Sequence, residues 1–247
     1  MDQDAPPGSR DPGGSAGSVW RRALSVSVAT GAYGVSFGAL AVAAGLTTAQ
    51  SCVLSLLMFT GGSQFAFIGV AASGGAGAAA VATSTLLGAR NGLYGLQLAP
   101  LLALPGRHRA LAAQLTIDES TAVATAQAAS TPDRRDLVRL GFWATGGGVF
   151  LGWNLATLAG AILGDQLGDP RRYGLDAAAP AAFLALLWPR LAGRTPALVA
   201  GLAAAAALAG VGVLPAGLPV LLSALVATGA GLRGPRTARP AGPGNRS

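Results

Sequence analysis

The sequence predicts an all-α integral membrane protein, a polytopic bundle of seven or eight transmembrane helices. Of the 247 residues, 51% are hydrophobic and only 11% are charged, whereas a soluble domain carries about 25% charged residues. The mean hydropathy is +0.51. Several apolar runs exceed the roughly 18 residues that indicate a spanning helix. Too little charge therefore remains to cover the water-exposed surface of a globule.

Polar segments rich in Pro and Gly lie at both ends, residues 1–20 and 233–247. They cannot bury apolar surface, so we expect them to be disordered. Residues 21–232 are expected to form one transmembrane domain. Its apolar runs predict helices over 24–46, 48–72, 74–104, 138–164, 196–214 and 215–232, with a short segment broken by Pro180 over 174–188.

The more polar segment 110–130 leaves the number of spans open. If it spans, there are eight helices with both ends inside, and if it does not, there are seven with the N-terminus outside. Arg21 and Arg22 abut the first helix, where the positive-inside rule gives charge most weight. This favours eight spans in the cytoplasmic membrane, with a cytoplasmic N-terminus and with Arg134 and Arg135 on that same face.

Several function classes are excluded by missing features. All 17 basic residues are arginine, but they are scattered and form no aromatic-interleaved patch, so no nucleic-acid partner is expected. The chain has no protease, hydrolase, phosphate-binding or dinucleotide motif and no paired Cys or His. We therefore expect no enzymatic activity, no cofactor and no metal, with membrane lipid as the surroundings.

A glycine pair interrupts the apolar run over 48–72. Gly61 and Gly62 weaken a helix by about 1 kcal/mol each relative to Ala, and Ser63 and Gln64 bring polar groups towards the bilayer centre. A helix broken here would offer free backbone groups to a substrate headgroup, with Phe65 beside it. The alternative is close helix packing, with Gln64 as an interhelical hydrogen-bonding residue.

Arg90 and Asn91 lie midway along the apolar run 74–104. A charged side chain at that depth costs about 2.5–3.5 kcal/mol and usually faces a partner or a watery cavity. Arg90 could bind a substrate carboxylate or pair with one of the acidic groups Asp118, Glu119 and Asp176. Alternatively, the helix breaks at Arg90, which then reaches the interface. Tyr94 lies one turn on, on the same face.

The three acidic groups Asp118, Glu119 and Asp176 are candidates for proton exchange during transport. Helix capping and a helix-dipole contact are the alternatives. The proline break at Pro180 offers a second stretch of free backbone for substrate.

A weak internal repeat relates two segments 114 residues apart. Gly34 and Gly38 recur as Gly148 and Gly152, and Phe65 then aligns with Phe183. Transporters are often built from such repeats, but Gly-rich helices also match by chance. Gly34 and Gly38 also form a GxxxG pair, which favours close helix packing.

A series of short stretches resembles the AzlC family, the large subunit of branched-chain amino-acid exporters. The stretches are Gly34-Val35-Ser36-Phe37-Gly38, Gly62-Ser63-Gln64-Phe65, Leu93-Tyr94-Gly95-Leu96, Thr116 to Glu119, and Gly174-Leu175-Asp176 with Pro180. This chain has Asn91 where many members carry histidine, which puts a titrating role at position 91 in doubt.

The resemblance implies a proton-driven secondary transporter that exports branched-chain and similar hydrophobic amino acids. It also implies a small hydrophobic AzlD-like membrane subunit as partner. The alternatives are a permease for another small solute and a non-transporting scaffold or regulatory subunit. A scaffold would have no need of Gln64 and Arg90 near the midplane.

Overall fold

The computed structural model describes residues 14–167, 172, 174, 184, 187–215 and 218–233, which contain helices and no strand. The chain divides into two compact units, residues 1–184 and 185–247, and each is described by itself. The first unit consists of α1 (Ala16–Ala43), α2 (Thr48–Leu57), α3 (Gly61–Ala72), α4 (Gly77–Leu102), α5 (Gly106–Gln114), α6 (Asp118–Ser130) and α7 (Arg135–Leu167).

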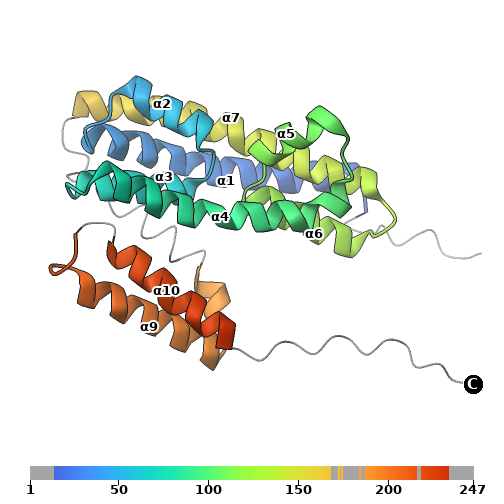
Figure 1. Cartoon of the computed structure of the whole chain (residues 1–247). Coiled ribbons are helices and arrows are strands. Elements are labelled where there is room, and N and C mark those ends of the chain that lie inside the picture. The colour runs from blue at the N-terminus through green and yellow to red at the C-terminus, as the bar shows by residue number, and fades with distance from the viewer. Residues whose placement is uncertain are drawn as a thin grey trace, which may run out of the picture. The chain divides into compact units, whose positions relative to one another are not determined.

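Helices α1 and α7 lie parallel along the whole length of this unit (Figure 1). Ser27 packs against Gly148 early in both helices, and Gly38 packs against Ala161 later in both. A Cβ atom on Gly38 would lie 2.6 Å from the backbone nitrogen of Ala161, so only glycine permits this approach. The close packing predicted for Gly34 and Gly38 is confirmed. We call the end where α1 and α7 begin the proximal end, and the other the distal end.

Helix α4 runs in the opposite direction. Arg139, near the start of α7, donates from Nε to the Leu102 carbonyl at 2.7 Å and from an Nη to the Ala103 carbonyl at 2.9 Å. The end of α4 therefore lies at the proximal end. With 26 residues, α4 is about 39 Å long. It continues through Arg90 without a break, so the alternative of a helix end at that residue is wrong.

The segment 48–72 forms a helical hairpin that enters from the distal end and returns there. Thr47 and Gln50 form a capping box that starts α2. The hairpin then runs back along α7, because Ser55 reaches Thr157 and Phe59 packs on Phe150. Helix α3 returns beside α4, to which a short turn connects it. The predicted helix break is confirmed, but the second half turns back instead of continuing across.

The segment 106–130 forms a second hairpin, which enters from the proximal end. Its start is held by Arg109, whose Nε donates to the Leu104 carbonyl at 2.7 Å. Its tip, Leu115–Ile117, lies midway along α7, where Leu115 is next to Gly146. Helix α6 then runs back to the loop that precedes α7. The chain thus forms two segments that each consist of a long helix followed by a hairpin, α1–α3 and α4–α6. These two segments run in opposite directions.

Two described helices, Ala16–Ala43 and Arg135–Gln166, are long and apolar enough to cross a membrane. Helix α1 begins at Ala16, inside the segment 1–20 that we expected to be disordered. The half-helices of the hairpins have 9 to 13 residues, about 14–20 Å, against a hydrocarbon core of about 30 Å. Each half-helix of 48–72 and 110–130 is therefore too short for a straight single crossing, and the number of spans stays a prediction. Both predicted counts include 48–72 as one crossing, and only the count of eight includes 110–130.

The second unit contains a 3-10 turn, Trp188–Leu191, followed by α9 (Arg194–Gly210) and α10 (Leu218–Arg233). Helices α9 and α10 pack against each other, and Gly210 contacts Leu214 and Pro219 at the turn between them. These helices correspond to the two predicted over 196–214 and 215–232.

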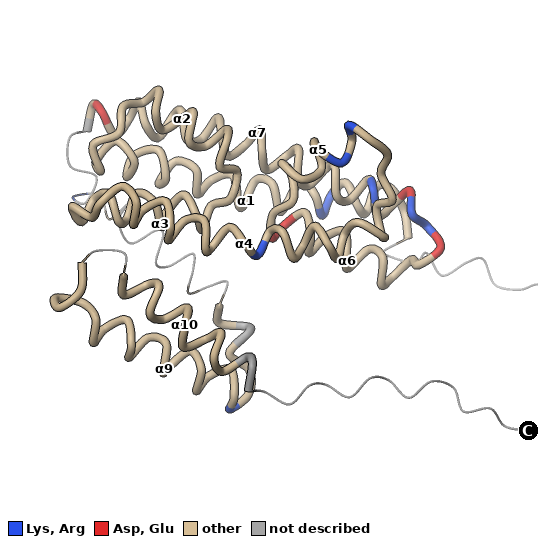
Figure 2. The backbone as a smooth tube through the Cα atoms, viewed as in Figure 1, with Lys and Arg blue, Asp and Glu red and all other residues tan. Residues whose placement is uncertain are grey.

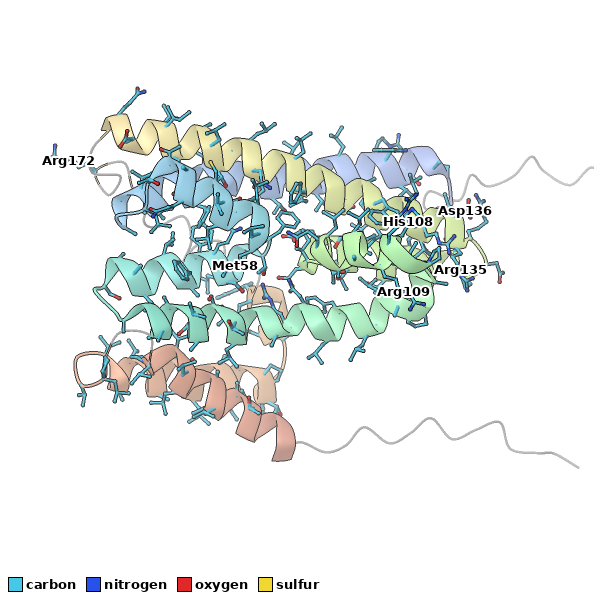
Figure 3. All side chains as sticks on the ribbon, turned by 45° about the horizontal axis from the view of Figure 1, so that its top comes forward. Met58, His108, Arg109, Arg135, Asp136 and Arg172 are labelled. Atoms are coloured by element: carbon cyan, nitrogen blue, oxygen red, sulfur yellow. The ribbon has the colours of Figure 1, made fainter. Side chains whose placement is uncertain are left out.

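Charged residues of the first unit gather at the proximal end. Figure 3 labels His108, Arg109, Arg135 and Asp136 there, on α5 and at the start of α7. Because α1 and α7 are parallel, the Arg21-Arg22 pair lies at the same end as the Arg134-Arg135 pair, as predicted. The face of the membrane that this end occupies stays a prediction.

Candidate functional site

The tips of the two hairpins meet in the middle of the first unit. Gln114, the last residue of α5, donates from Nε2 to the Leu56 carbonyl at 2.8 Å. This bond joins the end of α5 in the second hairpin to the end of α2 in the first. Phe59 and Ile117, one from each tip, belong to the same buried core cluster. Figure 3 labels Met58 at the inner end of the first hairpin. Broken helices that meet in this way place backbone dipoles near the bilayer centre, where transporters bind their substrates.

The first tip carries the predicted residues Gly61, Gly62, Ser63, Gln64 and Phe65 in the first turns of α3. Its N-cap has no side-chain hydrogen bond. The first N–H groups of a helix have no intrahelical partner, and its N-terminus carries partial positive charge. This end of α3 therefore favours an anionic group.

Gln64 is completely buried and holds the first tip together. Its Nε2 donates to the Met58 carbonyl at 2.7 Å and to the Ser55 carbonyl at 3.4 Å. Its Oε1 accepts from Trp153 Nε1 at 2.8 Å. Both ends of the amide are thus engaged within the protein, which favours the interhelical interpretation of Gln64 over direct contact with a substrate.

An aromatic cluster surrounds the same tip. The Phe65 ring lies edge-on to Phe37 and Trp153, with centroids 5.7 and 6.2 Å apart, and Phe37 stacks on Trp153. Phe59 packs on Phe150 beside them. These apolar surfaces lie next to the uncapped end of α3, so an aliphatic side chain would find contacts there.

The second tip places an ion pair in the interior. Arg90, midway along α4, contacts Asp118, the first residue of α6, with 3.0 Å between Nη2 and Oδ2. Figure 2 shows a blue and a red segment side by side where α4 and α6 meet, away from the charges at the proximal end. Of the two predicted acidic partners that the structure describes, Asp118 and Glu119, it is Asp118 that forms the ion pair with Arg90. Asp176 and Pro180 lie outside the described residues.

Glu119 follows Asp118 and contacts a different helix. Thr30 of α1 donates from Oγ1 to Glu119 Oε1 at 3.5 Å. The first turn of α6 therefore touches α4 through one carboxylate and α1 through the next. A change in the charge of either group would alter the contact between α6 and one of its neighbours.

Asn91 and Tyr94 lie beside Arg90 on α4, and both are partly buried. The Oδ1 atom of Asn91 is buried and has no hydrogen-bond partner among the described residues. Within that same part of the chain, no group of three His, Cys, Asp or Glu residues could hold a metal ion.

Three residues of this centre escaped the sequence analysis: Trp153, Thr30 and Gln114. Each is a single polar or aromatic residue within an apolar or Ala-rich run, and many such residues have no special role. Only the contacts with Gln64, Glu119 and Leu56 distinguish them.

The family model described as "AzlC protein" matches residues 25–167, which is more than half of the chain. The chain belongs to the AzlC family. The matched range includes both hairpins and the Arg90–Asp118 pair of this AzlC protein. No curated protein and no solved structure matches the chain. The family is associated with transport of branched-chain amino acids, and together with the apolar helices it indicates a membrane protein.

Proposed function

We propose that this protein is a secondary transporter that exports branched-chain and similar hydrophobic amino acids across the cytoplasmic membrane, coupled to protons. The observation that carries the proposal is the meeting of two broken helices beside a buried ion pair. Charged groups at this depth are costly and mark substrate or ion pathways, and half-helix ends at the midplane form the binding sites of several transporter folds.

The aromatic cluster at the first tip supports an apolar side chain as the substrate's other end. Phe37, Phe59 and Trp153 are buried within the protein. Phe65 packs against Phe37 and Trp153 and is itself partly exposed, so it is the ring of the cluster that an aliphatic side chain would contact. Such a surface separates aliphatic side chains poorly, because one methylene is worth only about 1–3 kcal/mol. We therefore expect overlapping transport of valine, leucine, isoleucine and methionine.

Proton coupling is assigned to the first turn of α6. Asp118 and Glu119 are adjacent carboxylates in a partly buried position, each in contact with a different long helix. Protonation of one carboxylate would weaken its contact and let α6 shift relative to α4 or α1. Asp176 remains a further candidate.

A small hydrophobic AzlD-like subunit is proposed as the partner, because a chain with polar groups in its interior needs another subunit or a filled cavity to shelter them. The proximal end is proposed as the cytoplasmic one, since arginines are concentrated there. Full export by the purified chain alone in liposomes would contradict the need for a partner.

Intracellular amino-acid pools test the function directly. Cells with and without the protein are loaded with leucine- and valine-containing dipeptides, and intracellular and external leucine and valine are followed over time. The proposal predicts lower intracellular pools and faster external appearance with the protein, and slower export after the proton gradient is collapsed. Equal pools in both strains, with the proposed partner co-expressed, would contradict export of these amino acids.

A further inference from the structure

The ion pair Arg90–Asp118 is only half formed. Its single contact joins Nη2 to Oδ2 at 3.0 Å. Arg90 Nε and Asp118 Oδ1 are both buried, and neither has a hydrogen-bond partner among the residues that the structure describes. These two atoms would complete a bidentate bridge. One is a charged donor and the other a charged acceptor, and a buried group of either kind is unfavourable without a partner.

A second arginine–aspartate pair in the same unit shows the complete geometry. Arg134 Nε donates to Asp136 Oδ1 at 3.0 Å, and Nη2 donates to Oδ2 at 2.8 Å. Both side chains are more than half exposed, at the proximal end. The exposed pair Arg134–Asp136 thus forms the full bidentate bridge although water could hydrogen-bond its atoms. The pair Arg90–Asp118 stays incomplete although water does not reach Arg90 Nε and Asp118 Oδ1.

From this difference we infer that Arg90 Nε and Asp118 Oδ1 form the receptor for a zwitterionic headgroup, the ammonium and carboxylate of an α-amino acid. The inference rests on the proposed function and names the part of the substrate that is recognised. An α-amino acid carries one acceptor group and one donor group on a single carbon atom. Its carboxylate accepts from Arg90 Nε, and its ammonium donates to Asp118 Oδ1.

The pair also rejects ligands that carry only one of these charges. A carboxylate without an ammonium meets the unpaired oxygen of Asp118 and is repelled by it. An amine without a carboxylate leaves Arg90 Nε unpaired and is repelled by the guanidinium. Selectivity of this kind arises from the repulsive element as much as from the attractive one.

The position of the pair fits this role. Arg90 retains 35% and Asp118 16% side-chain exposure, but the two unpaired atoms are buried. A headgroup therefore reaches them only when α6 shifts relative to α4, the movement proposed above for transport. The pair lies at the junction of α4 with the tip of the second hairpin. A headgroup bound there bridges two elements that otherwise share a single ion contact at this point.

Headgroup analogues of one side chain test the inference. Binding of leucine, leucinamide and 4-methyl-2-hydroxypentanoate to the full chain, purified together with the proposed AzlD-like subunit, is measured by displacement of labelled leucine. The amide lacks the carboxylate, and the hydroxy acid lacks the ammonium. We expect both analogues to bind the wild type at least about tenfold more weakly than leucine, a comparison that requires no variant.

Two variants assign the discrimination to the two atoms. Arg90→Gln should reduce the preference for leucine over leucinamide by at least about tenfold, and Asp118→Asn should reduce the preference for leucine over the hydroxy acid by the same factor. Arg134→Gln and Asp136→Asn are the matched controls and should keep the wild-type ratios. A merely structural role of the pair would lower all affinities together and leave the ratios unchanged.

The outcomes are distinct. If the wild type binds leucine but binds either analogue equally well, or if the Arg90 and Asp118 variants keep the wild-type ratios, the inference is overturned and the proposed function stands. If the wild type neither binds leucine nor exports it, the proposed function is overturned together with the inference.

Discussion

The two hairpins have the same architecture but are held by different interactions. At the first tip, Gln64 binds two carbonyl groups of its own hairpin and the indole of Trp153, all within a buried core. At the second tip, Asp118 makes one contact with Arg90, and Glu119 makes one long contact with Thr30. At the second tip Ser120 also closes the turn, since its hydroxyl accepts from the Ile117 N–H and donates to the Leu115 carbonyl. The first tip is thus held by neutral groups alone, whereas the second adds a charged pair that is incompletely hydrogen-bonded.

This difference suggests a structural role for the hydrogen bonds at the first tip and a role in transport for the charged groups at the second. A buried neutral network that is satisfied rigidifies the fold, whereas an incompletely paired charge is retained at a cost in stability. We therefore expect variants that break the hydrogen bonds of Gln64 at the first tip to lower the amount and stability of folded protein. Variants of the second tip should lower transport by protein that is still folded.

The largest effect is expected for Arg90→Ala. Truncating one partner of a buried hydrogen-bonded charge pair costs about 2–5 kcal/mol, and about 1.4 kcal/mol is a factor of ten, so efflux of labelled leucine from vesicles should fall by about 30-fold or more. Arg90→Lys should restore it only in part, because an ammonium cannot reproduce the guanidinium fork. Arg134→Ala should retain wild-type efflux. Wild-type rates for Arg90→Ala would remove this pair from the transport site.

Gln64→Ala should act on stability. It leaves Trp153 Nε1 without its acceptor, and a buried group left unsatisfied costs about 1–3 kcal/mol. It also removes one of two donors to the Met58 carbonyl, which keeps its bond from the Thr60 N–H at 2.8 Å. Thermal unfolding of the detergent-purified protein should therefore shift to lower temperature, and Trp153→Phe should reproduce part of the shift. Efflux per folded molecule should change little. A normal unfolding temperature with efflux of all four amino acids lost would instead place Gln64 in contact with the substrate headgroup.

Phe65→Ala should change selectivity more than overall rate. The ring lies in the aromatic cluster with Phe37 and Trp153, and its removal enlarges the surface offered to an aliphatic side chain. We expect the efflux ratio of leucine to valine to change by a few-fold up to about tenfold, since a methylene is worth about 1–3 kcal/mol. Initial rates from vesicles with equal amounts of folded protein provide the measurement. An equal loss for every amino acid would contradict a role in selectivity.

Thr30→Val should have the smallest effect. The contact with Glu119 is long, at 3.5 Å, so its loss should slow proton-driven efflux only a few-fold. Thr30→Ser keeps the hydroxyl and is the matched control. Comparing efflux at several imposed pH gradients tests whether the loss concerns coupling. A loss that is the same at every gradient would point to packing instead.

Much of the fold could be predicted from particular residues. The apolar runs located α1, α4 and α7 to within a few residues at most ends, and the Gly61-Gly62 pair located the break before α3. The GxxxG pair Gly34 and Gly38 predicted the close helix contact, because a missing Cβ is a local property with one direct packing consequence. The family assignment likewise followed from short stretches in a fixed order.

The internal repeat stays a prediction. Its two long helices, α1 and α7, are parallel and packed together, as copies in one orientation could be. The second half of its alignment, at Phe183, lies outside the described residues. The structure also shows that the segments α1–α3 and α4–α6 have opposite orientations. The sequence analysis found no similarity between these two segments.

The sequence by itself determined that the protein is helical, lies in a membrane and contains a broken helix, since these follow from composition and from local backbone preference. Only the tertiary structure decided that the chain turns back at the tips near Met58 and Thr116. A half-helix that returns and one that continues have the same length and hydropathy, so local composition cannot separate them. Likewise, Arg90 had three acidic candidates, and the choice of Asp118 depends on where a hairpin 28 residues away along the chain places its tip.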